Sequence, residues 1–491
     1  MHLSSFVYGQ NKFMMGWTST SLFGLMTTTM MMMMMIKLVY GNHHHHHRYY
    51  HGDQIHRLQE LKASLVHRMS ASLPVPAPYP QPQGVSKPRV YEVIKYGADP
   101  TGKSDSTEAL ERTFVDAIGG SSKGFLMEEI ANLGGAQIYL QGGNYLITRP
   151  LRFPASAVGN LMIHGGTITA SKDFPADAFL IDLSSPSPEN RGYNYEFITL
   201  KDLLLDCNHR AGGISVKNSL RITIDNCYIT HFTSNGILVQ GGHETYIRNS
   251  FLGQHITAGA DKRERNFSGT AISLIGNDNA VTDVVIFSAA KGILIEGQAN
   301  TLSGVHCYNK ATGFGGIGIH VKLPGLTQTR IVNCYLDYTG IVAEDPVQLL
   351  ISNSFFLGDA FIVLKSVKGI ASGVSIVDNM FSGSNRGIDM VQLDGAFQEI
   401  DQVIVERNSV RGMNLKSTEA KSSVQGNGSS WILDFNQLLL FPNKIRHVQY
   451  SFSTAGSFFP NHALQNMSDN RVVIQSNLPV SATVFVTVNQ Q

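Results

Sequence analysis

A short pattern of alternating apolar and polar residues recurs along the middle of the chain. Each copy contains a Gly or Ala followed by an alternating apolar stretch. The copies begin at Asn235, Gly269, Lys291, Gly318, Gly340, Ala360 and Gly387. A second pattern, apolar residues leading into Asn or Asp, follows most of them, as in Ile247–Asn249 and Ile351–Asn353. Self-similarity at a period of roughly 20 to 50 residues indicates stacked units that cannot bury an apolar face alone.

Each repeat offers two or three short strands and no helix-length periodicity. The pattern therefore predicts an all-β fold, a right-handed parallel β-helix with a sheet face able to hold an extended polymer. A capping signal at Ser104 and Asp105 predicts an N-terminal capping helix from Ser106 to about Ile118. Apolar runs between residues 431 and 488 predict a C-terminal antiparallel β cap, preceded by a polar loop at Lys416–Ser430.

Changes in composition divide the chain into four parts. Residues 1–41 are predicted to hold a signal peptide, because Leu22–Leu38 is apolar and rich in Met. A membrane anchor is the alternative, although Thr27–Thr29 interrupt this segment and it is short for a span. Residues 42–88 form a low-complexity, Pro-rich linker, residues 89–413 the β-helix catalytic domain, and residues 414–491 the β-rich cap. We expect a secreted, extracellular protein with no membrane segment after signal removal.

Cysteines and glycosylation signals bear on secretion. Asn266, Asn427 and Asn466 each open an acceptor sequon, which predicts a glycoprotein. Cys207 and Cys227 end similar apolar phrases, and so do Cys307 and Cys334. We expect each pair to lie one above the other on neighbouring coils. Their spacing permits a disulfide, and buried free thiols are the equal alternative.

The charge balance narrows the possible partners. The chain has 38 basic and 37 acidic residues, so it lacks the basic field of a nucleic-acid-binding protein. No metal signature stands out, and we expect neither a metal nor a cofactor. A monomer is expected.

The start of the predicted solenoid resembles a known family. Tyr-Gly-Ala-Asp-Pro-Thr-Gly at residues 96–102 and Gly-Gly-Ala-Gln-Ile-Tyr-Leu at residues 134–140 resemble the opening of pectate-lyase-type β-helix proteins, which include polygalacturonases and rhamnogalacturonases. Residues 268–281 and 305–319 resemble divergent plant polygalacturonases of the QUARTET type. The resemblance implies an extracellular enzyme that acts on demethylated pectin, homogalacturonan, in the plant cell wall.

The catalytic motifs of that family are largely absent. Typical polygalacturonases carry Asn-Thr-Asp, Asp-Asp, Gly-His-Gly and Arg-Ile-Lys on successive coils. The matching positions here are Thr233–Asn235, Ser268–Thr270, Ala290–Gly292 and His320–Lys322. Only Lys322 is kept, so the carboxylates of an inverting hydrolase, roughly 6.5 to 9.5 Å apart, must come from elsewhere.

An insertion between Gly253 and Gly269 is the best source of those carboxylates, because long loops on a rigid scaffold often carry sites. We predict Asp261 and Glu264 as acid and base, with Asp278 as a further catalytic candidate; a turn-forming role is the alternative for Asp278. The alternative for the insertion is a charged loop without chemistry. The residues predicted to bind substrate are His255, Lys262, Arg263, Arg265, Lys291, His320 and Lys322.

The repeats also align a column of alternating charge, Glu296, Lys322, Glu344 and Lys365. This column is either a groove for a sugar acid or a solvated ladder of ion pairs. Two other functions stay open. A polysaccharide lyase acting by β-elimination would use Lys291 and Lys322, and a pectin-binding wall protein would need no carboxylate. Unsaturated product ends would identify the former, and tight binding without turnover the latter.

Overall fold

The computed structural model describes residues 89–120, 123–127, 129–185, 192–254, 268–308, 316–454, 456–457 and 459–491. The predicted signal region and linker, and most of the insertion between residues 253 and 269, lie outside these ranges. Among the described residues, no helix is long and apolar enough to cross a membrane.

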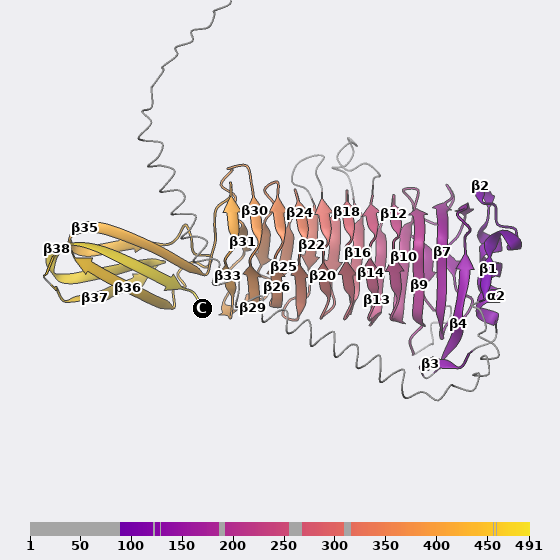
Figure 1. The fold of residues 1–491 in the computed structure, drawn as a ribbon, viewed down its shortest axis with the longest axis horizontal. Coiled ribbons are helices and arrows are strands. Elements are labelled where there is room, and N and C mark those ends of the chain that lie inside the picture. The colour runs from indigo at the N-terminus through magenta and orange to yellow at the C-terminus, as the bar shows by residue number, and fades with distance from the viewer. Residues whose placement is uncertain are drawn as a thin grey trace, which may run out of the picture. The chain divides into compact units, whose positions relative to one another are not determined.

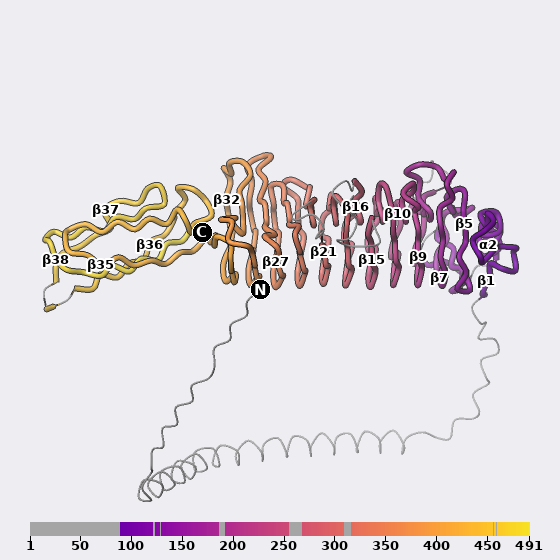
Figure 2. Tube along the Cα trace, turned by 90° about the horizontal axis from the view of Figure 1, so that it is seen from above, coloured from indigo at the N-terminus to yellow at the C-terminus, as the bar shows by residue number. Residues whose placement is uncertain are grey.

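The central part of the molecule is a parallel β-helix whose coils stack along one axis (Figures 1 and 2). Through the repeating coils, each strand pairs in parallel with the strand three places later, which creates three faces. The site face consists of β10 (Gly212–Leu220), β13 (Asn235–His243), β16 (Thr270–Asn277), β19 (Lys291–Ile295), β22 (Ile317–Val321), β25 (Ile341–Glu344), β28 (Ile362–Lys365) and β31 (Val391–Asp394).

The other two faces contain shorter strands. The second face consists of β11 (Thr223–Asp225), β14 (Tyr246–Arg248), β17 (Ala280–Thr282), β20 (Thr301–Ser303), β23 (Thr329–Val332), β26 (Val347–Ser352), β29 (Ile370–Val377), β32 (Glu399–Asp401) and β33 (Ile404–Glu406). The third face consists of β12 (Tyr228–Thr230), β15 (Phe251–Gly253), β18 (Val285–Phe287), β21 (His306–Tyr308), β24 (Tyr335–Asp337), β27 (Phe355–Leu357), β30 (Met380–Ser382) and β34 (Ser409–Arg411). The predicted fold class is confirmed.

The first coils are less regular and carry the helix. They contain β1 (Val90–Glu92), the 3-10 helix η1 (Val93–Tyr96), β2 (Thr101–Asp105), α2 (Thr107–Gly119), β3 (Phe125–Met127), β4 (Ile130–Tyr139), β5 (Asn144–Ile147), β6 (Leu151–Arg152), β7 (Val158–Ala170), β8 (Phe179–Leu183) and β9 (Tyr195–Asp206). The Asp105 carboxylate accepts a hydrogen bond of 2.9 Å from the Thr107 amide at the start of α2. Phe114 of α2 packs edge to face against Phe153. The predicted capping helix therefore exists and begins one residue later than expected.

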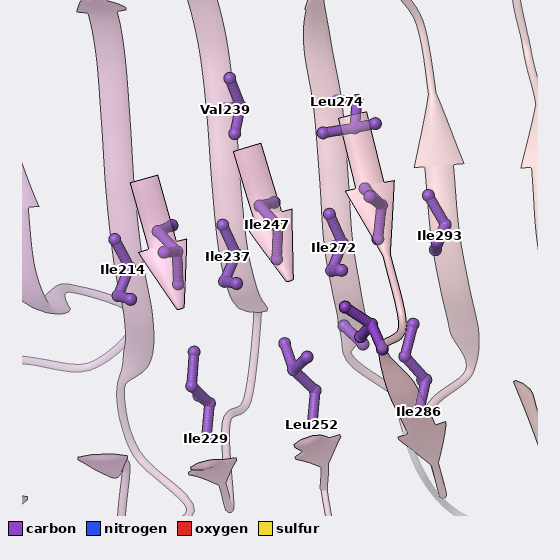
Figure 3. Packing of buried hydrophobic residues seen from close by; sticks show 14 of the residues in the cluster. Ile214, Ile229, Ile237, Val239, Ile247, Leu252, Ile272, Leu274, Ile286 and Ile293 are labelled. Atoms are coloured by element: carbon purple, nitrogen blue, oxygen red, sulfur yellow. The ribbon is translucent and has the colours of Figure 1, made fainter. Parts of the chain in front are cut away.

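Stacked aliphatic side chains fill the inside of the coils. Ile214, Ile237, Ile272 and Ile293 occupy register-paired positions on four neighbouring site-face strands and are fully buried (Figure 3). Burying one such side chain stabilises the fold by about 1.5 to 3 kcal/mol. This stack is why the alternating apolar phrase recurs in the sequence.

The recurring Asn or Asp marks a corner between the second and third faces. Asn249, Asn333 and Asn353 all adopt positive φ, near +50°. Asn and Asp tolerate this left-handed conformation better than other residues with a side chain. The second sequence pattern therefore marks the residues that form this corner of each coil.

The expected stacking of the cysteine pairs is wrong. Tyr228, next to Cys227, pairs with Leu204, whereas Cys207 follows Asp206, which pairs with Thr230. These two cysteines therefore lie at opposite ends of the paired segment. The second pair is also out of register, because Cys307 pairs with Leu336 and not with Cys334. All four cysteines are buried free thiols, which agrees with the alternative of small apolar side chains.

The C-terminal sheet is antiparallel, as predicted. It contains β35 (Glu419–Asp434), β36 (His447–Thr454), β37 (His462–Ser468) and β38 (Arg471–Asn489), and β38 pairs with the other three. The predicted loop at Lys416–Ser430 is wrong, because β35 already begins at Glu419. The polar, Gly-containing first part of β35 forms a strand because it pairs with β38. The buried side chains of this pairing come from β38, at Val484, Val486 and Val488.

Candidate active site

The strands of the site face present two outward columns that matter for chemistry. The starting column, at the beginning of the strands, contains Asn235, Thr270 and Lys291 in direct register. The ending column, where the strands finish, contains Glu296, Lys322, Glu344 and Lys365. Backbone hydrogen bonds Glu296 N to Leu274 O and Lys322 N to Ile295 O continue the strand pairing to these residues. Neighbouring members are about 4.8 Å apart at the backbone.

The starting column carries no carboxylate at its three positions. Asn235 and Thr270, placed at the first two motifs of typical polygalacturonases, offer an amide and a hydroxyl, and Lys291 offers an ammonium group. The Ser273 hydroxyl donates to Asn235 Oδ1 at 2.6 Å. The register puts Ile317 beside Lys291, and not Gly318 as the repeat pattern suggests. These positions are neighbours in space, as the motif placement requires, but their chemistry differs.

The ending column forms ion pairs between neighbouring coils. Lys322 Nζ lies 2.9 Å from Glu296 Oε1. Lys365 Nζ lies 3.2 Å from Glu344 Oε1. The Glu296 and Lys322 side chains are 28% and 48% exposed, so their pair is solvated and contributes little stability by itself. The predicted charge alternation and its ion pairing are confirmed.

Glu344 differs from the other members because it is buried. Its side chain is only 9% exposed. His320, which projects from β22 between Leu294 and Val342 in the register, brings Nε2 to 3.2 Å from the same Glu344 Oε1. Two donors therefore converge on one carboxylate oxygen, and a lysine and a histidine hold this carboxylate in place.

Electrostatics favour the charged form of that carboxylate. Burial alone would raise the pKa of Glu344, but the hydrogen bonds from Lys365 and His320 outweigh it, and the pKa is lowered. Burial lowers the pKa of His320, the hydrogen bond to Glu344 opposes this shift, and the charge of Lys291 reinforces it. The favoured state is an ionised Glu344 beside a neutral imidazole that donates from Nε2.

Most of the sequence-predicted site lies outside the described residues. This applies to His255, Asp261, Lys262, Arg263, Glu264 and Arg265. Asp278 is described: it is an exposed corner residue with φ of 55°, and its amide donates to Gln298 O. It lies just beyond the end of β16, at the opposite end from Thr270, in a position that suits the turn-forming alternative.

The structure brings Lys291, His320 and Lys322 together on the site face, where Glu344 is a buried carboxylate; their binding of substrate stays a prediction. Sequence reasoning placed Glu344 in the column but had no sign of its burial or of its contact with His320. The available signal was the outward position of both residues on consecutive repeats. Within the described ranges, no three His, Cys, Asp or Glu side chains are arranged to hold a metal ion.

Comparison with known proteins connects this arrangement to a family. Residues 90–317 match the family described as rhamnogalacturonase A/epimerase, pectate lyase-like. Polygalacturonase QRT3 of Arabidopsis thaliana is 63% identical over 445 residues, which cover 90% of this chain and 92% of that protein. The chain therefore belongs to the pectate-lyase-like β-helix proteins, in the family of polygalacturonase QRT3.

Solved structures with distant sequences are also similar. The endo-xylogalacturonan hydrolase from Aspergillus tubingensis is 10% identical, with a TM-score of 0.46 and coverage of 67% of this chain and 95% of that chain. A tailspike protein mutant of E. coli bacteriophage HK620, in complex with a pentasaccharide, is 10% identical, with a TM-score of 0.48 and coverage of 82% and 94%.

Proposed function

We propose that this protein is a glycoside hydrolase that cleaves α-1,4-galacturonan, the homogalacturonan of pectin, in the plant cell wall. The observation that carries the proposal is the charged ending column around Lys322, in a chain 63% identical to a polygalacturonase. Lys322 is the one residue of the typical motifs that the chain retains. A polyuronate carries one anion per sugar, and ammonium groups on alternate coils of the ending column are suited to bind such a polymer.

The proposed reaction is inverting hydrolysis. One carboxylic acid protonates the leaving oxygen, and one carboxylate takes a proton from the attacking water. Asp261, Glu264 and Asp278 are the carboxyl groups that the sequence proposes for these roles. The proposed binding groups are His255, Lys262, Arg263 and Arg265 of the insertion, together with Lys291, His320 and Lys322. Secretion, a wall location and a monomeric state complete the proposal.

A lyase is the second candidate, because one observation favours it. The starting column has Lys291 in register with Asn235 and Thr270, and none of the three is a carboxylate. A lysine ammonium group near a uronate can stabilise the negative charge that develops when C5 loses its proton, and a lysine in its neutral amine form can take up that proton, so β-elimination requires no carboxylate base.

The test is incubation of the secreted, full-length protein with polygalacturonic acid, with and without a chelator. Reducing ends and the ultraviolet absorbance of unsaturated uronate are followed together. New reducing ends without absorbance are the expected result, and Asp261→Asn and Glu264→Gln would then be assayed. Absorbance that rises with the reducing ends would replace the hydrolase by the lyase. Binding without either signal would identify a pectin-binding wall protein.

A further inference from the structure

We propose that Glu344 is the catalytic base of the hydrolytic site, and that His320 and Lys365 are the positioning residues that hold it. This inference rests on the proposed function, and it assigns the role of the base to Glu344 in place of the carboxyl groups that the sequence suggests for that role. It is argued from three features of the described site face: the bonding of the two carboxylate oxygens, the burial of the group, and its position beside Lys322.

The first feature is the unequal use of the two carboxylate oxygens. Both hydrogen bonds, from Lys365 Nζ and His320 Nε2, end on Oε1 at 3.2 Å. In the part of the chain that the structure describes, Oε2 receives no hydrogen bond. A carboxylate fixed through one oxygen and open at the other has the form that a general base needs. One oxygen sets the orientation, and the other accepts the proton.

The second feature is the burial of Glu344, which is deeper than that of Glu296, the other acid of the ending column. The Lys365 side chain is 42% exposed and its partner Glu344 only 9%. Removing a carboxylate from water costs several kcal/mol unless its partners compensate. His320 is also buried, and its Nδ1 has no hydrogen-bond partner among the described residues. The His320 imidazole is therefore held through Nε2 alone, by the same carboxylate oxygen that Lys365 contacts.

The third feature is the position of Glu344 next to the retained lysine. Lys322 lies between Glu296 and Glu344 in the ending column, so its ammonium group separates two carboxylates that are two coils apart, about 9.6 Å at the backbone. The charge of Glu344 acts on Lys322 as well as that of Glu296. A galacturonate carboxylate bound by Lys322 would therefore place its sugar beside Glu344.

The chemical step balances with water as the only co-reactant. Glu344 Oε2 takes one proton from a water molecule while the water oxygen forms a bond to the anomeric carbon. The bond from that carbon to the glycosidic oxygen breaks, and its electron pair stays on the leaving oxygen. A proton from the acid of the site completes the new hydroxyl group. The base then releases its proton to solvent and the acid takes one up from solvent, so the site is restored and one water is consumed for each bond cleaved.

The decisive variant is Glu344→Gln, assayed on polygalacturonic acid with the full chain. The amide oxygen can still accept from Lys365 and His320, but the side chain cannot take up a proton. We expect kcat to fall by about 10²- to 10⁴-fold, the usual range for a lost general base. KM should stay close to that of the wild-type protein, and Tm should fall only by the contribution of the lost Glu344 charge, with the protein still folded at the assay temperature. Asp378→Asn is the matched control, because Asp378 is an ion-paired acid at an exposed corner, 2.9 Å from Arg407.

A second variant separates chemistry from folding. Glu344→Ala leaves space for a small anion, and added formate should restore at least about tenfold of the lost kcat by replacing the missing base. Formate should not change the kcat of the Asp378→Asn variant. The inference is overturned if Glu344→Gln keeps kcat within about threefold of the wild type, or if its loss follows a lower Tm and formate restores nothing. A wild-type protein that releases no reducing ends would overturn the proposed function together with this inference.

Discussion

The two outward columns of the site face are built on the same strands but differ in their chemistry. At the strand starts, Asn235, Thr270 and Lys291 occupy the positions of the family's motifs without a carboxylate. Toward the strand ends, two glutamates alternate with two lysines, and one glutamate is buried. In this chain the three starting-column residues are in register with one another, and the acidic side chains of the site face lie several residues further along the strands. A fold can preserve its geometry while its reactive groups change position.

The difference between the two columns is tested most strongly by replacing one lysine in each, Lys322 in the ending column and Lys291 in the starting column. Lys322→Met removes the ammonium group from the ending column, and we expect kcat/KM on polygalacturonic acid to fall by about 100-fold, since a charge-assisted contact is worth roughly 1.5 to 3 kcal/mol. Lys291→Met should cost about tenfold or less. A larger loss for Lys291 would return the chemistry to the starting column and favour the lyase.

The dependence of Tm on pH gives a second test, with a smaller expected effect, of the buried carboxylate Glu344. The pKa of Glu344 is lowered in the folded protein, so its ionised form stabilises the fold above its ordinary pKa of 4.5. This contribution is lost as the pH falls through the folded value. Lowering the pH below about 4.5 should therefore reduce the Tm of the wild type more than that of Glu344→Gln. If the Tm of both proteins falls by the same amount as the pH is lowered, ionisation of Glu344 does not contribute to the stability of the fold.

The smallest effect is expected from restoring a motif acid. Asn235→Asp keeps an acceptor for the Ser273 hydroxyl and places a carboxylate in the starting column. Because the ending column carries the proposed chemistry, kcat/KM should change by less than about threefold. An increase of tenfold or more in the rate of reducing-end release would show that the starting column is still able to act as the site.

The extent of sequence prediction varies between elements for physical reasons. The repeat, the helix α2 and the charged column were all predictable. Each follows from a spacing of residues that can be read from the sequence alone, without knowing which distant segments come into contact. The loop expected at Lys416–Ser430 was not, since this part of β35 becomes a strand through pairing with β38, from Glu419 with Asn489 to Ser430 with Gln475, far along the chain. The cysteine stacking failed because a shift of a few positions within one coil leaves the repeat spacing almost unchanged.

The site shows the same division. By itself, the sequence determined which residues point outward in the middle of the strands and in the ending column, because side chains alternate between the two sides of a strand. It thereby determined the solenoid, the loss of the motif acids and the alternation from Glu296 to Lys365. Only the tertiary structure decided that Glu344 is buried and that His320 and Lys365 meet on one of its oxygens. Burial and convergence depend on neighbouring coils together, and no single stretch of sequence contains that information.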